Sequence, residues 1–344
     1  MLATPPFSLA ASRRLRMAKR AQVTAALLAL LLALLVLTLT LGQSFTPPSD
    51  VLRVLLGEDV AGASFAVGQL RLPRGVLAVL SGLSFGMAGA AFQIMLRNPL
   101  ASPDIIGISS GASAAAVFAI VVLSLKGTAV SLFAIGAGLS VALLVYGLSF
   151  RNGVAGTRLI LVGIGVSAML ESMVAYVLTQ APEWSLQEAL RWLSGSLNGV
   201  QLAQAIPVLV TLALFGGLLL MRSRDLDLLR LGDDTAAALG VRVSQTRVLV
   251  IVAAVGLIAT ATAVTGPIAF VAFLSGPIAA RVVGPRQSLL IPAALVGAVL
   301  VLGADYAGQF LLPGRYPVGV ITGALGAPYL IYLIVRANRA GGTL

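Results

Sequence analysis

Few side chains in this sequence could do chemistry, and most of them are carboxylates and guanidinium groups. Asp233 and Asp234 adjoin one another shortly after Asp225 and Asp227, and such a cluster could in principle hold a hard divalent cation. The spacing fits no complete ligand pattern. Helix capping explains the pair more simply, because Asp233, Asp234 and Thr235 offer N-cap oxygens and negative charge to a helix start. We therefore predict a helix start and no metal site.

Two further carboxylates, Glu171 and Asp305, fall inside apolar segments. A carboxylate in hydrocarbon is costly, so each is expected to face a cavity or a partner and is a candidate for a transport path. Both positions are also near the ends of their segments, where water or a capping group would satisfy them equally well. No histidine or lysine accompanies them, so they make a poor proton relay.

Several chemistries are excluded by missing residue types. Cysteine and histidine are absent, which removes disulfides, thiolate metal sites, the usual proton shuttle and the usual partner of a nucleophilic serine. No G-x-x-x-x-G-K-[ST] phosphate loop exists, because Lys19 and Lys126 are the only lysines and follow Ala18 and Leu125. The chain cannot itself be a P-loop ATPase, and an intramembrane enzyme is the least supported class.

Three arginines stand out because we expect them on the outer side of a membrane. Arg71 and Arg74 flank Leu72-Pro73, and Arg315 lies in the turn LPGRYPVG. Pro73 fixes the local backbone and is expected to present the two guanidinium groups. Such a cluster would hold the surface carboxylates of a docking protein. Anchoring to lipid headgroups is the alternative.

The composition identifies the elements that must position these groups. Of the 344 residues 58% are hydrophobic and 10% are charged, and the mean hydropathy is +1.01. A water-soluble chain keeps far more polar surface, so we predict an all-α, polytopic membrane protein with one transmembrane domain over residues 1–344. The net charge of +11 arises mostly from residues that flank apolar spans.

Ten membrane-spanning segments are expected. The first is the apolar run Ala25–Leu41, which follows a basic segment, residues 1–20. The others lie near 75–96, 105–124, 128–149, 157–180, 201–221, 247–265, 268–283, 288–311 and 317–335. Ten crossings place both termini on the cytoplasmic side and put 17 of the 23 cationic residues there. An error of one crossing would swap every later loop and spoil this bias.

The segment 222–247 is a polar interval between two apolar blocks. It holds five arginines and four aspartates, so it must lie in water. A short helix is expected to start at 233–235 and to stop at Gly240, which can take the left-handed conformation. A capped helix in this place is suited to being pushed by a partner, although an ordinary structured loop is the alternative.

A second short helix is expected between spans five and six. The sequence PEWSLQEALRWLSGSLNG at 182–199 places Trp184, Leu186, Leu190 and Leu193 at helical spacing. This pattern indicates an amphipathic helix on the outer surface.

Five motifs in order give the chain a family resemblance. They are RLPR at 71–74, LRNPLASPDIIGISSGAS at 96–113, LGDDTAAALGV at 231–241, TGPIAFVAF at 265–273 and LPGRYPVGVITGALGAPYLIYLI at 312–334. Together they resemble the FecCD-type permeases of bacterial iron-siderophore ABC importers, a group that includes the vitamin B12 permease. RNG at 151–153, GSLNG at 195–199 and GDDTAAALGV look most like the second permease subunit for ferric enterobactin.

The resemblance implies a type II ABC importer permease fold, with ten transmembrane helices per subunit and a translocation path at a dimer interface. The coupling loop within 222–247 would sit in a cleft of the ATPase subunit and the outer helix would help to gate the path. The implied residues are Asp233, Asp234, Thr235, Leu239 and Gly240 for coupling, Arg71, Arg74 and Arg315 for docking, and Trp184, Trp192, Ser196, Glu171 and Asp305 for the gate or path.

The function expected from this resemblance is that of a non-catalytic permease subunit. It would move a ferric siderophore of the catecholate, enterobactin-like type across the bacterial inner membrane, from a substrate-binding protein into the cytoplasm. ATP-Mg would be bound and hydrolysed on two copies of a separate ATPase, and a second permease subunit, related or identical, would complete the path. We expect no cofactor on this chain and no nucleic-acid partner.

Two alternatives remain at this stage. An ion-coupled secondary transporter would need titratable or cation-coordinating groups near the midplane, and Glu171 and Asp305 are the only candidates. A permease of the same fold could instead carry cobalamin or haem.

Overall fold

A computed structural model of the chain describes residues 9–149, 156–284 and 288–339, and the regular elements in these ranges are all helices. Seven helical stretches are long and apolar enough to span a membrane. They contain α1 (Leu9–Thr40), α3 (Leu72–Leu96), α5 (Thr128–Ser149), α6 (Gly156–Thr179), α8 to α9 (Ala205–Met221), α12 (Val243–Thr265) and α14 (Leu290–Tyr306) continued by η5 (Ala307–Leu311). Three shorter apolar helices are α4 (Ile108–Val121), α13 (Val271–Val283) and α15 (Val318–Arg339).

These ten apolar segments agree with the ten that the sequence predicts, and two details differ. Helix α1 begins at Leu9, so much of the basic segment is continuous with the first span instead of preceding it. The interval 43–69, between the first two predicted spans, contains α2 (Pro48–Leu55) and most of the π-helix η1 (Ser64–Arg71). Residues 1–8 of the basic segment and the motif at 151–153 lie outside the described residues, and the single-domain assignment remains a prediction.

Helix α3 is the centre of the packing. It contacts α12, α13 and α14, and nearly all of its residues from Ser81 onward are buried. A Cβ atom on Gly82 or Gly86 would overlap the backbone of α14, at Ala298 and Ala293 respectively. Small residues allow two helices to approach this closely in lipid, where the hydrophobic effect does not drive helix association.

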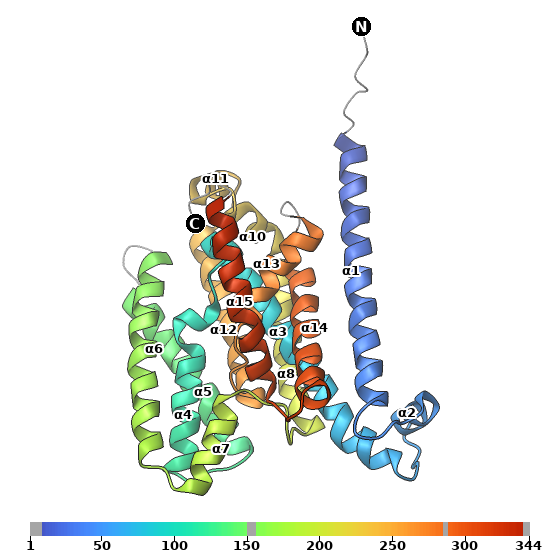
Figure 1. The fold of residues 1–344 in the computed structure, drawn as a ribbon. Coiled ribbons are helices and arrows are strands. Elements are labelled where there is room, and N and C mark those ends of the chain that lie inside the picture. Colours follow the sequence, from blue (N-terminus) through green and yellow to red (C-terminus); the bar gives the residue numbers. More distant parts are fainter. Residues whose placement is uncertain (1–8, 150–155, 285–287, 340–344) are drawn as a thin grey trace.

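The helices define two ends of the molecule (Figure 1). The short helices α10 (Ser223–Leu229) and α11 (Asp233–Ala238) lie at one end, here called the α11 side, with the start of α1 and the end of α15. Helices α2 and α7 (Glu183–Leu193) lie at the opposite end, the α7 side. Helices α4, α5 and α6 pack against one another as a second group. This group contacts α12, which also packs against α3.

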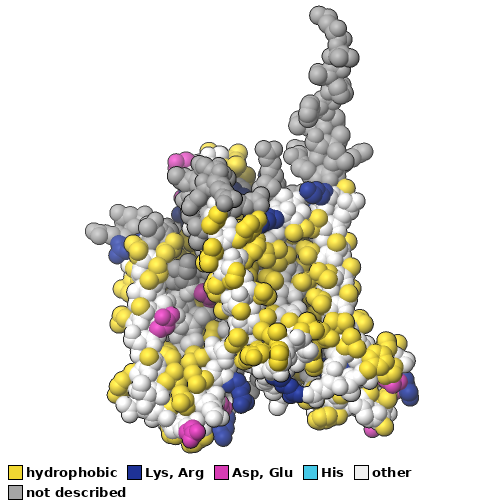
Figure 2. All heavy atoms as spheres, viewed as in Figure 1, with side chains coloured by type: hydrophobic (Ala, Val, Ile, Leu, Met, Phe, Trp, Pro, Cys, Tyr) yellow, Lys and Arg dark blue, Asp and Glu magenta, His cyan; other side chains and the backbone are white. Residues whose placement is uncertain are grey.

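Hydrophobic side chains cover most of the middle of the visible face in Figure 2, and lysine and arginine side chains gather toward the two ends. Helices α6 and α8 to α9 are little buried, with 17% and 22% of their most apolar windows inside the molecule. Such faces are suited to lipid or to another apolar protein surface.

The close approach of α3 and α14 predicts a stability effect. Gly86→Ala should lower the thermal stability of the purified protein in detergent, by an amount equivalent to about 1–3 kcal/mol, because the added methyl overlaps a backbone carbonyl of α14. Gly136→Ala in α5 is the matched control, since a Cβ there meets open space. Equal midpoints for the two variants would contradict this account of the packing.

Candidate functional site

The polar segment folds on the α11 side as two short helices, α10 and α11. Gly240 takes the left-handed conformation with φ of 87°. Its N–H donates to the Ala237 carbonyl at 2.9 Å, and the Val241 N–H donates to the Ala236 carbonyl at 3.0 Å. These bonds close the end of α11 in the way that the sequence predicts.

Asp233 does not cap α11, which corrects the sequence-based prediction. The residue before the helix is Gly232, and no side chain caps this end. Instead, the Arg247 Nη2 atom donates to both carboxylate oxygens of Asp233, at 3.0 and 2.9 Å, and the Arg97 Nη2 atom lies 3.8 Å from Oδ1. A guanidinium group outcompetes the backbone N–H because its hydrogen bonds to a carboxylate are charge-assisted. Asp233 thereby ties α11 to the start of α12 and to the end of α3.

The remaining residues predicted to act in coupling are accessible. Asp234, Thr235 and Leu239 are exposed, and the side chain of Leu239 retains 57% of its accessibility. Leu231, just before α11, is also exposed. The helix thus presents leucines at both ends within a polar segment.

The other two acids of this segment also have arginine partners. Asp225 lies 3.1 Å from Arg222, and Asp227 lies 3.7 Å from Arg230. Burial raises the pKa of Asp227 above its usual range, and the positive charge of Arg230 opposes this shift. Among the described residues, no group of three His, Cys, Asp or Glu side chains is placed to hold a metal ion.

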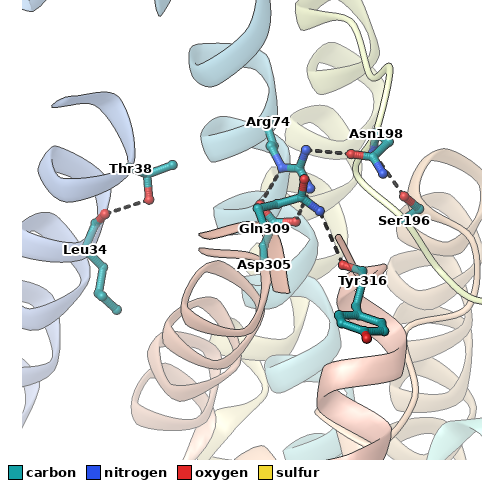
Figure 3. A network of polar contacts seen from close by, with 8 residues as sticks. All are labelled: Leu34, Thr38, Arg74, Ser196, Asn198, Asp305, Gln309 and Tyr316. Atoms are coloured by element: carbon teal, nitrogen blue, oxygen red, sulfur yellow. Dashed lines mark hydrogen bonds and ion pairs between the residues drawn. The ribbon is translucent and has the colours of Figure 1, made fainter. Parts of the chain in front are cut away.

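A second polar network lies on the α7 side and is centred on Arg74 (Figure 3). Its Nε and Nη2 atoms donate to the two carboxylate oxygens of Asp305, at 2.5 and 2.7 Å, and its Nη1 atom donates to Asn198 Oδ1 at 2.7 Å. The side chain of Asp305 is 2% exposed and that of Arg74 is 16% exposed. Asp305 is therefore neither solvated nor open to a path, because a bidentate arginine satisfies its charge.

This network continues into the loop after α7. The Asn198 N–H donates to Ser196 Oγ at 3.1 Å, and the Ser196 N–H donates to the Thr265 carbonyl at 2.7 Å. The structure thus brings together Arg74, predicted for docking, and Ser196 and Asp305, predicted for the gate or path. They link the start of α3, the loop and the end of α12.

Arg71 is placed differently from the sequence-based prediction. Its residue is only 9% exposed, and its guanidinium group donates to the carbonyls of Leu39, Thr40 and Ser44, at 2.9, 3.1 and 2.6 Å. It satisfies carbonyl groups at the end of α1, which have no partner within that helix. Pro73 lies in the first turn of α3, which continues directly from η1, so it does not turn Arg71 outward.

Arg315 is exposed in the turn between η5 and α15, as expected. The neighbouring Tyr316 holds this turn, since its N–H donates to the Gly308 carbonyl at 2.9 Å and its carbonyl accepts from Gln309 Nε2 at 3.3 Å. Of the three predicted docking arginines, Arg315 has the freest surface. The docking role itself stays a prediction.

The amphipathic helix predicted near 182–199 is confirmed as α7. Trp184 is exposed on it, whereas Trp192 packs against the buried cluster of α4 and α5. A cavity of about 280 Å³ lies beside this helix and is lined by Trp192, Ser196, Asn198, Glu188 and Arg191, among others. The two tryptophans thus lie in different environments.

Glu171 is exposed on α6, roughly two turns before the helix ends at Thr179. Among the described ion pairs none involves Glu171. A carboxylate at such a position in an apolar helix needs water or a partner chain to satisfy it.

Three residues of these sites are missing from the sequence-based prediction: Asn198, Arg97 and Arg247. Asn198 lies within the quoted motif GSLNG, and Arg97 lies within LRNPLASPDIIGISSGAS, so the motifs contained a signal. Their partners are distant in the sequence, and nothing in the local pattern identifies them.

The sequence is similar to a family of transport proteins and to individual permeases. The model of the FecCD transport family matches residues 30–336. The ferric enterobactin transport system permease protein FepG of Escherichia coli is 42% identical over 298 residues, which cover 85% of this chain and 88% of that protein. The achromobactin transport system permease protein CbrC of Dickeya dadantii is 39% identical over 332 residues, 95% of each chain.

A solved structure of a metal-chelate type ABC transporter in an inward-facing conformation has the same fold. The TM-score is 0.82 with 28% sequence identity, and the match covers 92% of this chain and 99% of that one.

The buried pair Arg74–Asp305 predicts a strong energetic coupling. Asp305→Asn alone should lower thermal stability by about 3–5 kcal/mol, because it leaves a buried arginine without its counter-charge. Arg74→Met with Asp305→Asn should cost less than the sum of the two single changes. A double-mutant cycle on unfolding midpoints measures this.

The pair Arg53–Glu58 is a matched control, since its atoms are also 2.7 Å apart but its side chains are 55% and 52% exposed. Neutralising that pair should leave the midpoint unchanged within error. Additive effects at Arg74 and Asp305 would show that the two groups are not coupled.

Proposed function

The chain belongs to the FecCD transport family, and from this membership we propose that it is the membrane permease subunit of an ABC importer for a ferric siderophore. ATP is bound and hydrolysed on a separate ATPase subunit, present in two copies. The absence of a phosphate loop from the sequence supports this division of labour. An ion-coupled transporter is disfavoured, because Asp305 is neutralised by Arg74 and does not face a cation site.

The observation that carries this proposal is the geometry of α11. The helix is short, closed by Gly240 and held by Asp233 to Arg247 and Arg97, and it presents Leu239 outward. A rigid, exposed helix of this kind between two membrane blocks is suited to bind in a cleft of an ATPase. Asp234 and Thr235 would contact the same surface.

The mechanism follows from these attachments. ATP binding closes the two ATPase subunits and displaces each α11. Because Asp233 joins α11 to the start of α12 and the end of α3, both helices receive the displacement. A closed interface is bistable, so a small rigid shift at one end can open a path at the other.

A second permease subunit completes the path. The exposed apolar residues of α6 and α15 support a contact with another membrane chain; they include Leu161, Ile164, Met169, Tyr176, Leu325, Ile331 and Tyr332. Glu171 on the same helix α6 would line the shared path, where a hydrated cavity satisfies its carboxylate. Trp184 and Trp192 would position α7 at its outer mouth.

The α11 side would face the cytoplasm. The predicted bias of positive charge supports this orientation. The start of α1 and the end of α15 lie on the same side as α11, which fits cytoplasmic termini and an inner-membrane location.

The α7 side would receive the substrate-binding protein. Arg315 is exposed there, as are Arg53 on α2 and Arg191 on α7, and Arg315 would bind a carboxylate of that protein. We assign Arg74 a different role, in which it holds the loop of Ser196 and Asn198. Docking near Arg315 could then act on a gate formed by this loop and α7.

The substrate class rests on the relatives. FepG is named for the transport of ferric enterobactin and CbrC for that of achromobactin, and YfhA of Bacillus subtilis, 35% identical, is named as a probable siderophore transport permease. We therefore propose a ferric siderophore, of the catecholate type in the first instance. Cobalamin and haem are the substrates to test against it.

The coupling role of α11 can be tested in proteoliposomes that contain this chain purified with its co-expressed neighbours. The unaltered complex should take up ⁵⁵Fe-enterobactin only when ATP reaches the ATPase, and excess cobalamin or haem should not compete. Leu239→Ser should reduce uptake by about tenfold, because an apolar contact of about 1–2 kcal/mol with the ATPase is lost. Binding-protein docking should be unaffected.

Leu56→Ser is the control, since Leu56 is similarly exposed but lies after α2 on the opposite side. Full uptake by Leu239→Ser would exclude α11 as the coupling element. Uptake without ATP would exclude the class of ABC importers.

The docking role of Arg315 predicts a separable defect. Arg315→Glu should weaken binding of the substrate-binding protein by about tenfold, since a favourable charge pair becomes a repulsive one. The ATPase should still copurify. Affinity is measured on the complex in nanodiscs, with Arg53→Glu as a control for surface charge; unchanged affinity in Arg315→Glu would move the docking surface elsewhere.

A further inference from the structure

Helix α3 ends at Arg97 in a conformation that favours glycine. Arg97 has φ of 53° and ψ of 30°, its N–H donates to the Ile94 carbonyl at 3.2 Å, and the Asn98 N–H donates to the Gln93 carbonyl at 3.1 Å. A side chain in the left-handed region is strained, and such strain marks positions where the side chain has a use. The Arg97 guanidinium group reaches Asp233 of α11, as described above.

One turn earlier, Gln93 binds a different helix. Its Nε2 atom donates to the Phe273 carbonyl of α13 at 2.9 Å, and the residue is 7% exposed. In a regular helix that carbonyl would accept from the residue four positions later, which here is Pro277 and has no N–H. The Gln93 amide therefore satisfies the carbonyl that the proline leaves open. A Cβ on Gly276 would overlap Gln93 Oε1, so the glycine makes room for this contact.

Gln93 and Arg97 are four residues apart and lie on one face of α3. A cavity of about 290 Å³ lies beside them and is lined by both residues together with Arg230, Gly276 and Pro277. The space adjoins the proline of α13 and the arginine that directly follows α10. The proline break in α13 thus has room to change its angle.

Beyond Phe273 lies a larger cavity of about 410 Å³, lined by Phe270, Phe273, Asp104 and Leu193, among others. Phe270 also has a left-handed backbone, with φ of 65°, and its ring meets that of Phe273 edge to face at 6.2 Å between centroids. A series of contacts therefore leads from α11 through the last turn of α3 and the start of α13 to this cavity.

We propose that the last turn of α3 is the transmission element of the transporter, and that Gln93 is its positioning residue. Arg97 receives the displacement of α11 through Asp233. Gln93 then transfers it to α13 at the Phe273 carbonyl, which Pro277 leaves without a backbone donor. The rings of Phe270 and Phe273 then change the shape of the cavity. This inference rests on the proposed function, because it takes α11 to be driven by an ATPase.

The test is the amount of iron taken up per ATP hydrolysed by the purified complex in proteoliposomes, with ⁵⁵Fe-enterobactin as the probe. Gln93→Met keeps the length of the side chain and removes its donor. ATP hydrolysis should continue while the ratio falls by about tenfold or more, since loss of a buried hydrogen bond changes an equilibrium by about that factor. Gln69→Met is the control, because Gln69 is exposed in η1 and lies outside the coupling segment 222–247.

A second variant separates transmission from folding. Pro277→Ala supplies an N–H that competes with Gln93 for the Phe273 carbonyl, so it should itself lower the ratio, and Gln93→Met should have no further effect in that background. An equal further loss there would overturn the proposal. So would failure of Gln93→Met to assemble with the ATPase, because that result assigns Gln93 to folding alone.

The proposed function and this inference are overturned by different results. If the unaltered complex shows no ATP-dependent uptake, the proposed function is overturned together with this inference. If the unaltered complex transports normally and Gln93→Met has an unchanged ratio, the inference alone is overturned.

Discussion

The close packing of α3 against α12, α13 and α14 is the constraint on which the rest of the structure depends. Lipid supplies no hydrophobic drive between helices, so association requires backbones that approach until dispersion contacts are dense. Gly82 and Gly86 permit this approach, and a Cβ atom at either would overlap α14. Helix α3 is consequently held on several sides along its length, and its two ends are fixed relative to one another.

Each end of this helix satisfies polar groups that other elements leave open. Arg71 binds carbonyls at the end of α1, and Arg74 neutralises the buried carboxylate of Asp305. At the other end, Gln93 binds the carbonyl that a proline frees, and Arg97 reaches Asp233. Unsatisfied polar groups are expensive away from water, so the contacts of Arg71, Arg74 and Gln93 add to packing in holding the neighbouring elements against α3. The half-exposed pair Arg97–Asp233 adds a weaker link. A membrane permease driven from one side needs such a connection between its two faces.

The sequence predicted the spans, the amphipathic helix α7 and the end of α11 because each depends on local properties: apolar length, helical periodicity and a glycine at the right place. It failed where a side chain chooses among distant partners. Arg71 was expected at the surface, but the carbonyls that it binds lie about thirty residues away in another helix. Asp233 was expected to cap α11, and Arg74 was not connected with Asp305, which lies 231 residues further on. Charge and spacing mark such residues as notable and leave their partners undetermined.

The central claim is that α11, the last turn of α3 and α13 move together when the ATPase closes. The chain contains no cysteine, so single cysteine pairs can carry spin labels without background. The most direct measurement is the distance between two spin labels in the complex in lipid, taken without nucleotide and again with ATP and vanadate. One pair is Thr235 with Val282 and the other is Val282 with Met169, and all three residues are exposed. The account predicts an unchanged distance between α11 and α13 and a changed distance between α13 and α6. A nucleotide-dependent change between α11 and α13, with none between α13 and α6, would contradict it.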